Sequence, residues 1–306
     1  MRRFVWLGAL VGMARVAAAA TAVWIDTDVS IGSPIREVDD AYALLLACRS
    51  PEIRIAGIST SYGNASLAHT TRAARELVPH FGCGSEIFPG AASRLHETRT
   101  AAIDGLARAL KQERLTYVAI GPLTNLAGFL RFHPQSAKRI DRVIFLGGHE
   151  PRDRLSFGSN GWFRIHDANV FKDSASAAAV LRSRIPLTLV PILAAGRLQV
   201  DEIDRRFLER SGDGAEYVAR RSKMWLWFWK NIVKEKGGPI FDAAAVTAAA
   251  RPELLATERR WARMDESGNL VASRAPASNA RRVRYCRSFA PQTKRIVLER
   301  LGMRQP

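Results

Sequence analysis

The chain has few cysteines, few acidic residues and no long apolar run, and each of these scarcities excludes a class of protein. It has 3 cysteines in 306 residues, and Cys48, Cys83 and Cys286 form neither a C-x-x-C pair nor a zinc-binding spacing. We therefore expect free, mostly buried thiols and no disulfide framework. Acidic residues are also few, because 29 Asp and Glu face 46 Lys and Arg, which gives a formal net charge of +17. No apolar run is long and charge-free enough to be a spanning helix.

The basic excess raises the question of an acidic partner, such as nucleic acid or a membrane surface. The alternative is a generally basic, Arg-rich protein that has no such partner. No basic run is long, aromatic residues are not interleaved with the arginines, and no nucleic-acid motif is recognisable. We therefore expect no specific nucleic-acid partner. Polyanion binding remains a third hypothesis, which a steep salt dependence would support.

The N-terminus has the composition of a secretory signal peptide over residues 1–20. A basic start precedes an apolar run over 4–13, and the small residues 17–20 offer a cleavage site near Ala20. This pattern predicts an exported protein, periplasmic or secreted. Arg15 interrupts the apolar part, so a cytoplasmic chain with an apolar N-terminal extension is the alternative.

Strand and helix patterns alternate along the rest of the chain. Short β-rich runs are found at 22–26, 53–60, 116–121, 142–148 and 187–192, with helical patterns at 39–49, 66–81, 124–132 and 174–183. The alternation predicts an α/β fold, an open Rossmann-like architecture with a mostly parallel sheet covered by helices on both faces. We expect one domain over 21–306, with a helical cap or insertion at about 200–240. An edge hairpin over 259–273 and a closing helix complete the expectation.

Acidic residues gather where the first predicted strand gives way to a helix. Asp26 and Asp28 end the strand, and Asp39 and Asp40 begin the helix. In sheets of this kind, ligands bind beyond the carboxyl ends of the strands. Capping the helix would need only one or two carboxylates, and four close together repel one another unless a cation joins them. Oxygen-only ligands favour a hard cation, and a flexible set of carboxylates suits Ca²⁺ better than Mg²⁺.

Six segments, taken in order, resemble the inosine-uridine preferring nucleoside hydrolase family. They are D-T-D followed by D-D-A-x-A (26–43), TSYGN (60–64), AIGPLTNLA (119–127), FLGGH (145–149), DANVFKDSASAAAVL (167–181) and PIFDAAAV (239–246). Together they span roughly residues 22 to 250. The resemblance implies hydrolysis of the N-glycosidic bond of ribonucleosides to ribose and free base, a bound Ca²⁺, and a dimer or tetramer.

The resemblance also implies roles for particular residues, carried over position by position. Asp28 and Asp242 would be catalytic, with Asp28 as the general base that takes a proton from a metal-activated water. The metal ligands would be Asp28, Asp39, Asp40, Asp242 and the backbone carbonyl of Ile120. The substrate contacts would be Asn64, Asp167, Asn169, Asn160 and Phe241. Asp26 would buttress the ligands or the neighbouring backbone.

The chain departs from the family pattern at three places. The turn between Asp28 and Asp39 is lengthened over 29–38, Asp167 stands where Glu is usual, and Phe241 replaces a His that often protonates the leaving base. An aromatic residue at 241 resembles purine-preferring members, because a ring there can stack on the base. A core residue is an equal alternative.

Three further points stay open at the level of sequence. Other candidate acids are His149 and His166, although isolated histidines are more often structural. The aromatic run at 224–229 indicates packing more than substrate contact, because Trp225 and Trp229 share a helical face. The alternative to an active hydrolase is a catalytically altered or inactive protein that binds nucleosides or other N-ribosides on the same scaffold.

Overall fold

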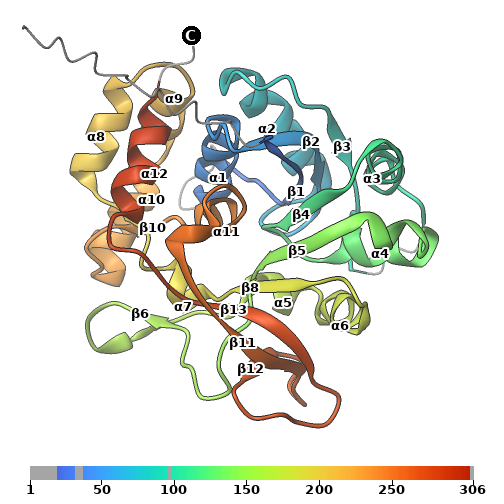
Figure 1. Cartoon of the computed structure of the whole chain (residues 1–306). Helices are drawn as coiled ribbons and strands as arrows, with labels where there is room; N and C mark the ends of the chain where they lie inside the picture. The colour runs from blue at the N-terminus through green and yellow to red at the C-terminus, as the bar shows by residue number, and fades with distance from the viewer. Residues whose placement is uncertain (1–18, 32–36, 95–97, 304–306) are drawn as a thin grey trace, which may run out of the picture.

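The computed structural model describes residues 19–31, 37–94 and 98–303. Among these residues, nine strands form a central sheet in the order β12-β11-β13-β8-β5-β4-β1-β2-β3 (Figure 1). The strands are β1 (Thr21–Thr27), β2 (Ile53–Thr60), β3 (Ile87–Pro89), β4 (Leu115–Ala119), β5 (Ile140–Leu146), β8 (Leu187–Val190), β11 (Leu255–Met264), β12 (Leu270–Ser273) and β13 (Arg281–Phe289). All neighbours from β3 through β13 run parallel, and only the pairs of β11 with β13 and β12 are antiparallel. The mostly parallel sheet is confirmed, and β11 with β12 is the hairpin expected over 259–273.

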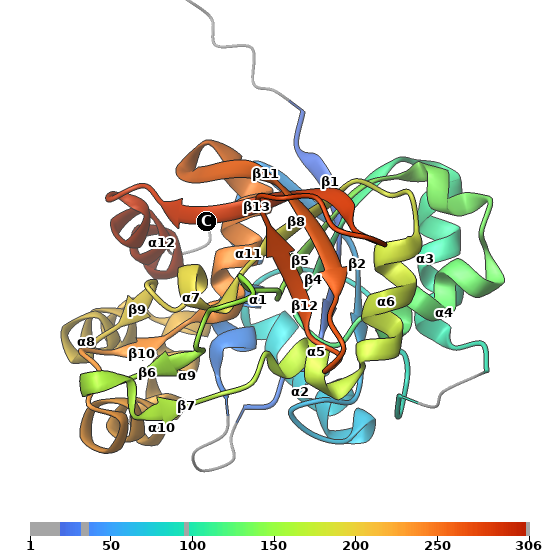
Figure 2. The ribbon, with the colours of Figure 1, turned by 90° about the horizontal axis from the view of Figure 1, so that it is seen from below.

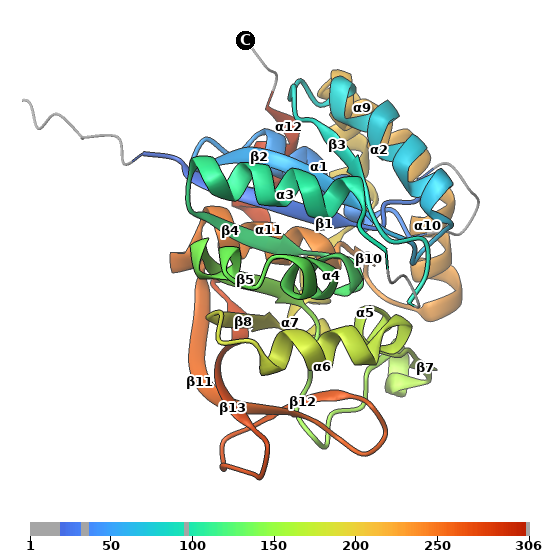
Figure 3. The same ribbon diagram turned by 90° about the vertical axis from the view of Figure 1, so that its right-hand side faces the viewer.

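Helices cover both faces of the sheet because its strands are apolar on both sides. In β1, Val23 and Ile25 pack into one core cluster, whereas Trp24 packs into the other. The first cluster includes residues of α1 (Asp39–Cys48), α2 (Leu67–His80), α11 (Phe241–Ala250) and α12 (Thr293–Gly302). The second includes residues of α3 (Ala101–Gln112), α4 (Thr124–Phe132) and α6 (Ser174–Arg182), which Figure 3 shows together on one face.

A helical region lies at one side of the molecule, away from α3 and α4 (Figure 1). It consists of α8 (Glu202–Arg210), α9 (Asp213–Arg221), α10 (Lys223–Trp227) and the π-helix η3 (Phe228–Val233). A short ribbon of β9 (Gln199–Val200) and β10 (Gly238–Pro239) joins its two ends. A second ribbon, β6 (Ser156–Phe157) with β7 (Phe163–Arg164), lies beside α10 (Figure 2), where Phe163 contacts Phe228 edge to face.

The remaining elements are short. They are α5 (Ala168–Lys172), α7 (Ile192–Ala195) and the 3₁₀ turns η1 (Ser136–Arg139), η2 (Ser159–Gly161) and η4 (Pro252–Leu254). In the described part of the chain, no helix has the length and apolar character needed to cross a membrane. The signal peptide expected over 1–20 falls almost entirely outside the described residues, and so does 32–36 of the lengthened turn.

The expectation for the cysteines is wrong for two of the three. Cys48, at the end of α1, forms a disulfide with Cys83, which follows α2, and their Cα atoms are 5.5 Å apart. Neighbouring helix ends bring the two residues together across a sequence separation of 35, and spacing alone cannot show such a contact. Cys286 is a free, buried thiol, as expected.

Candidate active site

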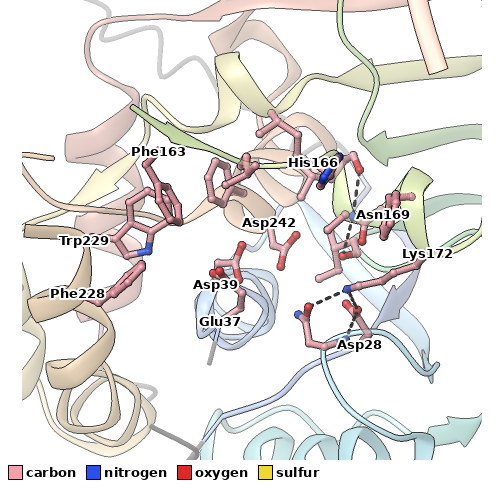
Figure 4. A pocket seen from close by; sticks show the side chains of 18 residues that line it. Asp28, Glu37, Asp39, Phe163, His166, Asn169, Lys172, Phe228, Trp229 and Asp242 are labelled. Atoms are coloured by element: carbon pink, nitrogen blue, oxygen red, sulfur yellow. Dashed lines mark hydrogen bonds and ion pairs between the residues drawn. The ribbon is translucent and has the colours of Figure 1, made fainter. Parts of the chain in front are cut away.

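A cavity of about 350 Å³ opens at the edge of the sheet where the parallel strands end (Figure 4). The turns after β1, β2, β4 and β5 all contribute to its wall, as the topology of a parallel sheet requires. Its polar lining comprises Asp28, Glu37, Asp39, Asn64, His166, Asn169, Lys172 and Asp242. Its aromatic lining comprises Phe163, Phe171, Phe228, Trp229 and Phe241.

Three carboxylates meet at the floor of this cavity, where Asp39 and Asp242 belong to its lining and Asp40 is fully buried beside them. Asp39 and Asp40 occupy the first turn of α1, and Asp242 occupies the first turn of α11. One oxygen of each lies within 4.8 Å of the others, and all three side chains are buried. The positive ends of two helices therefore face a cluster of negative charge, which is favourable to the carboxylates.

Burial is the main cause that shifts the protonation of these three groups. It raises the pKa of Asp40 to about 8, with the charge of Asp28 as the next cause. The pKa values of Asp39 and Asp242 are raised well above their ordinary value by burial and by the neighbouring carboxylates. Ionisation of the whole cluster therefore requires additional positive charge.

The donor set fits a hard divalent cation. Every candidate atom is an oxygen, and Oδ1 of Asp39 is buried with no hydrogen-bond partner among the described residues, so it can accept a ligand. The carbonyl of Ile120 belongs to a residue on the same cavity wall. Asp39, Asp40 and Asp242 are thus the residues that could hold such an ion.

Asp28 is close to this cluster but is engaged by a different cation. Its Oδ2 accepts hydrogen bonds from Nζ of Lys172 at 2.7 Å and from the backbone N–H of Asn64 at 2.8 Å. Asn64 also accepts from Lys172 at 2.8 Å and donates through Nδ2 to Oδ2 of Asp40 at 3.1 Å (Figure 4 draws the Lys172 contacts). Gly63 permits this approach, since a Cβ there would lie 1.8 Å from Oδ2 of Asp28. Asn64 therefore links Asp28 to Asp40, through its backbone N–H and its side-chain amide respectively.

Asn169 lies on α5, the helix that also carries Lys172, and is fixed by two carbonyls. Its Nδ2 donates to the backbone oxygens of Leu146 at 3.1 Å and Ile120 at 3.3 Å. Two of the three amide residues expected to contact substrate, Asn64 and Asn169, therefore line the cavity from different segments.

Aromatic rings form the side of the cavity away from Asp28 (Figure 4). Phe241 and Trp229 meet at 6.1 Å between ring centroids, and Phe163 meets Trp229 at 5.8 Å. Phe241 is also 6% exposed, so it is both a core residue and a wall residue. Trp225, in contrast, is buried away from the cavity lining, next to Tyr42.

Two residues expected to contact substrate do not line the cavity. The carboxylate of Asp167 caps α5, accepting from the backbone N–H of Val170 at 3.3 Å and of Gly148 at 2.6 Å. Asn160 is exposed in the turn η2. The geometry gives no support to sugar contacts by either, which stay predictions. Of the two histidines, only His166 lines the cavity, stacked on Phe171 at 4.9 Å.

The model of the inosine-uridine preferring nucleoside hydrolase family matches residues 23–293. The chain belongs to this family. Members of the family are N-glycosyl hydrolases of nucleosides and are metal-dependent, which agrees with the carboxylate cluster at the cavity floor.

Known members of the family resemble the chain along most of its length. A pyrimidine-specific ribonucleoside hydrolase, RihA, from Citrobacter koseri is 27% identical over 265 residues, covering 75% of this chain and 81% of the relative. A plant nucleoside hydrolase structure, PpNRh1, has a TM-score of 0.77 at 21% identity, covering 92% of this chain and 98% of that one. A purine-preferring ribonucleoside hydrolase from Gardnerella vaginalis has a TM-score of 0.75 at 19% identity, covering 92% of this chain and 98% of that one. The two structures establish the nucleoside hydrolase fold.

Behind the cavity, the GPLTN segment of this nucleoside hydrolase has a structural role. Asn125 donates to Oδ1 of Asp26 at 2.7 Å and to the carbonyl of Thr60 at 3.2 Å, so it joins the ends of β1 and β2. Burial raises the pKa of Asp26 to about 6, although hydrogen bonds from Ser59 and Asn125 act in the other direction. Asp26 therefore supports the backbone that carries Asp28, as expected.

The sequence did not reveal Lys172, Glu37 or Phe163 as cavity residues. A signal for Lys172 exists in the nucleoside hydrolase segment at 167–181. Lys172 follows Asn169 by three positions on α5, and residues so spaced share one helix face. Phe163 lies in a two-residue strand, which carries no periodic pattern.

Proposed function

We propose that this nucleoside hydrolase cleaves the N-glycosidic bond of ribonucleosides with the help of Ca²⁺, giving ribose and free base. The observation that carries the proposal is the buried cluster of Asp39, Asp40 and Asp242 at the floor of a cavity walled by aromatic rings. The ion would be held by these three carboxylates, with Asp28 and the carbonyl of Ile120 beside them. When bound, Ca²⁺ would orient a water molecule and lower its pKa.

The chain's own residues divide the remaining tasks. Asp28 would accept the proton of the attacking water as general base. Asn64 and Asn169, which both line the cavity, would hydrogen-bond the ribose hydroxyls. The carboxylates would stabilise the positive charge that develops on the sugar as the bond to the base breaks.

The proposed base preference is for purines. Phe241 and Trp229 offer ring surface on the cavity wall, and stacking is most favourable for a large π-face. A pyrimidine preference is the second candidate, because the relative from Citrobacter koseri is named as pyrimidine-specific.

The test is a hydrolysis assay on the purified protein. Release of free base and ribose would be followed for purine and pyrimidine nucleosides, with added Ca²⁺ and with chelator. We expect release that needs Ca²⁺ and falls at least about 100-fold in Asp242→Asn, because that change removes a charge from the ion's ligand set. Asp141→Asn is the matched control, since Asp141 is exposed and forms an ion pair with exposed Arg114.

Two results would contradict parts of the proposal. Folded protein that releases no base from any nucleoside would leave the alternative, a binding protein on the same scaffold. Release that is equally fast with chelator would remove the metal from the mechanism but keep the hydrolysis.

We further propose that the mature chain is exported and acts as a dimer or tetramer. The N-terminal composition and the Cys48–Cys83 disulfide both support export, because disulfides persist mainly in oxidising compartments. The N-terminal residue of the protein recovered from its native cells would decide the first point. Its mass in solution would decide the second.

A further inference from the structure

We propose that Lys172 is an internal cation that shares the acidic cavity with the divalent ion and weakens the binding of that ion. Lys172 is thus a positioning residue that holds Asp28 and Asn64 in place. Its positive charge competes with the divalent ion for the negative charge of the cavity. The inference rests on the proposed metal site, and it assigns to this chain a residue that lowers the affinity of that site.

The ammonium group of Lys172 contacts both Asp28 and Asn64, the two residues that it would hold in place. Lys172 ends α5 on the cavity wall, and its Nζ contacts Oδ2 of Asp28 at 2.7 Å and Oδ1 of Asn64 at 2.8 Å. The Lys172 side chain is 19% exposed and that of Asp28 is 1% exposed, so water screens this ion pair only weakly.

The ion pair occupies the oxygen that a metal would otherwise use. Oδ2 of Asp28 already accepts two hydrogen bonds, one from Lys172 and one from the backbone of Asn64. A carboxylate oxygen has two lone pairs, so this atom has none left for a further ligand. The three carboxylates that come within 4.8 Å of one another are Asp39, Asp40 and Asp242, without Asp28. A divalent ion must therefore bind without this oxygen or displace the ammonium group from it.

The charge of Lys172 acts on the whole cluster. The buried carboxylate of Asp28 contacts the ammonium group at 2.7 Å, and this ion pair favours the charged form of Lys172. Lys172, Asp39 and Asp242 line the same cavity, so a fixed positive charge on Lys172 repels a divalent ion held by the carboxylates, and a partly buried site screens that repulsion only weakly. Removing the charge while keeping the length of the side chain should tighten metal binding.

The experiment measures Ca²⁺ binding by calorimetry on protein freed of metal with chelator, so the readout is independent of catalysis. In Lys172→Met we expect the dissociation constant for Ca²⁺ to fall by roughly ten-fold or more, because one repulsive charge is lost. Lys172→Arg keeps the charge and should stay within about three-fold of wild type. Lys230→Met is the matched control, since Lys230 is exposed on η3 and its loss changes the net charge equally. It should leave the constant unchanged.

An unchanged or weaker affinity in Lys172→Met would overturn the inference, and so would equal tightening in Lys230→Met. If Lys172→Met does not fold, Lys172→Gln gives the same comparison, because it keeps a donor for Asp28 without the charge. The outcome is separable from the proposed hydrolysis. Tighter Ca²⁺ binding by Lys172→Met with no nucleoside cleavage by wild type would keep the inference and remove the function. Cleavage by wild type with unchanged Ca²⁺ affinity in the variant would do the reverse.

Discussion

Among single residues, Phe241 should determine whether the cavity prefers purine or pyrimidine bases. Phe241→Leu keeps an apolar side chain on the wall but removes the ring, and base stacking on an aromatic ring contributes about 1–3 kcal/mol. We expect kcat/KM for purine nucleosides to fall about ten-fold, and for pyrimidine nucleosides less, because their rings offer a smaller face. Steady-state kinetics on one nucleoside of each class would measure the difference.

Phe157→Leu separates contact with the base from packing around it. Phe157 lies edge to face against both Phe241 and Trp229 at 5.6 Å, but it does not line the cavity. We expect this control to lower stability and to leave the ratio of purine to pyrimidine rates unchanged. An equal change of that ratio in both variants would show that Phe241 acts only as a core residue.

The sequence predicted the positions of those site residues that lie at the start of a helix, because a helix start has a local pattern. Asp39 and Asp40 begin α1 as predicted, and Asp242 joins them because its helix starts at the same edge of the sheet. The engagement of Asp28 by Lys172 could not be predicted, because their sequence separation of 144 gives no signal. Asp167 has the right residue type for a sugar contact, yet as the N-cap of α5 it is satisfied by backbone donors instead.

At the scale of elements, the start of α8 has the most complete cap in the described chain, a capping box. The Asp201 side chain accepts from the backbone of Ile203 at 2.8 Å and Asp204 at 3.0 Å, and Asp204 accepts in return from Asp201 at 2.9 Å. Lys294 of α12 adds an ion pair to both acids, at 3.2 Å and 2.7 Å. This cap therefore fixes α8 against the closing helix.

Asp201→Ala should lower the free energy of unfolding at pH 7 by about 1 kcal/mol, the usual cost of losing an N-cap. Burial would raise the pKa of Asp201, but hydrogen bonds from Asp204 and Ile203 and the charge of Lys294 lower it overall. A lowered pKa gives stability that is complete above the unfolded value of about 3.9 and disappears as the pH falls through the folded value. Urea unfolding at pH 7 and pH 3 would show whether the difference shrinks, with exposed Glu266→Ala as the control.

Periodic elements were predictable and aperiodic ones were not. The pattern at 66–81 gave a helix within one residue of α2 at each end, because buried side chains recur at helical spacing, as at Thr70, Ala74 and Leu77. The π-helix η3 and the β6–β7 ribbon had no such signal, since their shape depends on Phe163, Phe228 and Trp229 packing together. The aromatic wall of the cavity is made largely by these segments, which is why it was expected only in part.

At the scale of the whole molecule, alternating strands and helices predicted a parallel sheet, but not the order of its strands. That order follows from crossovers whose partners are distant in sequence, such as β1 lying between β2 and β4. The same limit explains why the disulfide could not be predicted from the sequence. Cys48 and Cys83 were expected to be free because their spacing matches no motif, and the fold brings them together.

The disulfide should contribute a large part of the stability of the folded chain. Closing a loop of 35 residues removes conformational freedom from the unfolded chain, which corresponds to about 3–4 kcal/mol in the entropic description. We expect the variant with both Cys48→Ser and Cys83→Ser to unfold at a clearly lower urea concentration than wild type, and reductant to bring wild type to the same midpoint. Cys286→Ala keeps the bond and should still respond to reductant, whereas the double variant should not. A wild-type midpoint that reductant leaves unchanged, with the bond shown by mass spectrometry to be broken, would mean that packing of α1 and α2 alone holds this corner of the molecule.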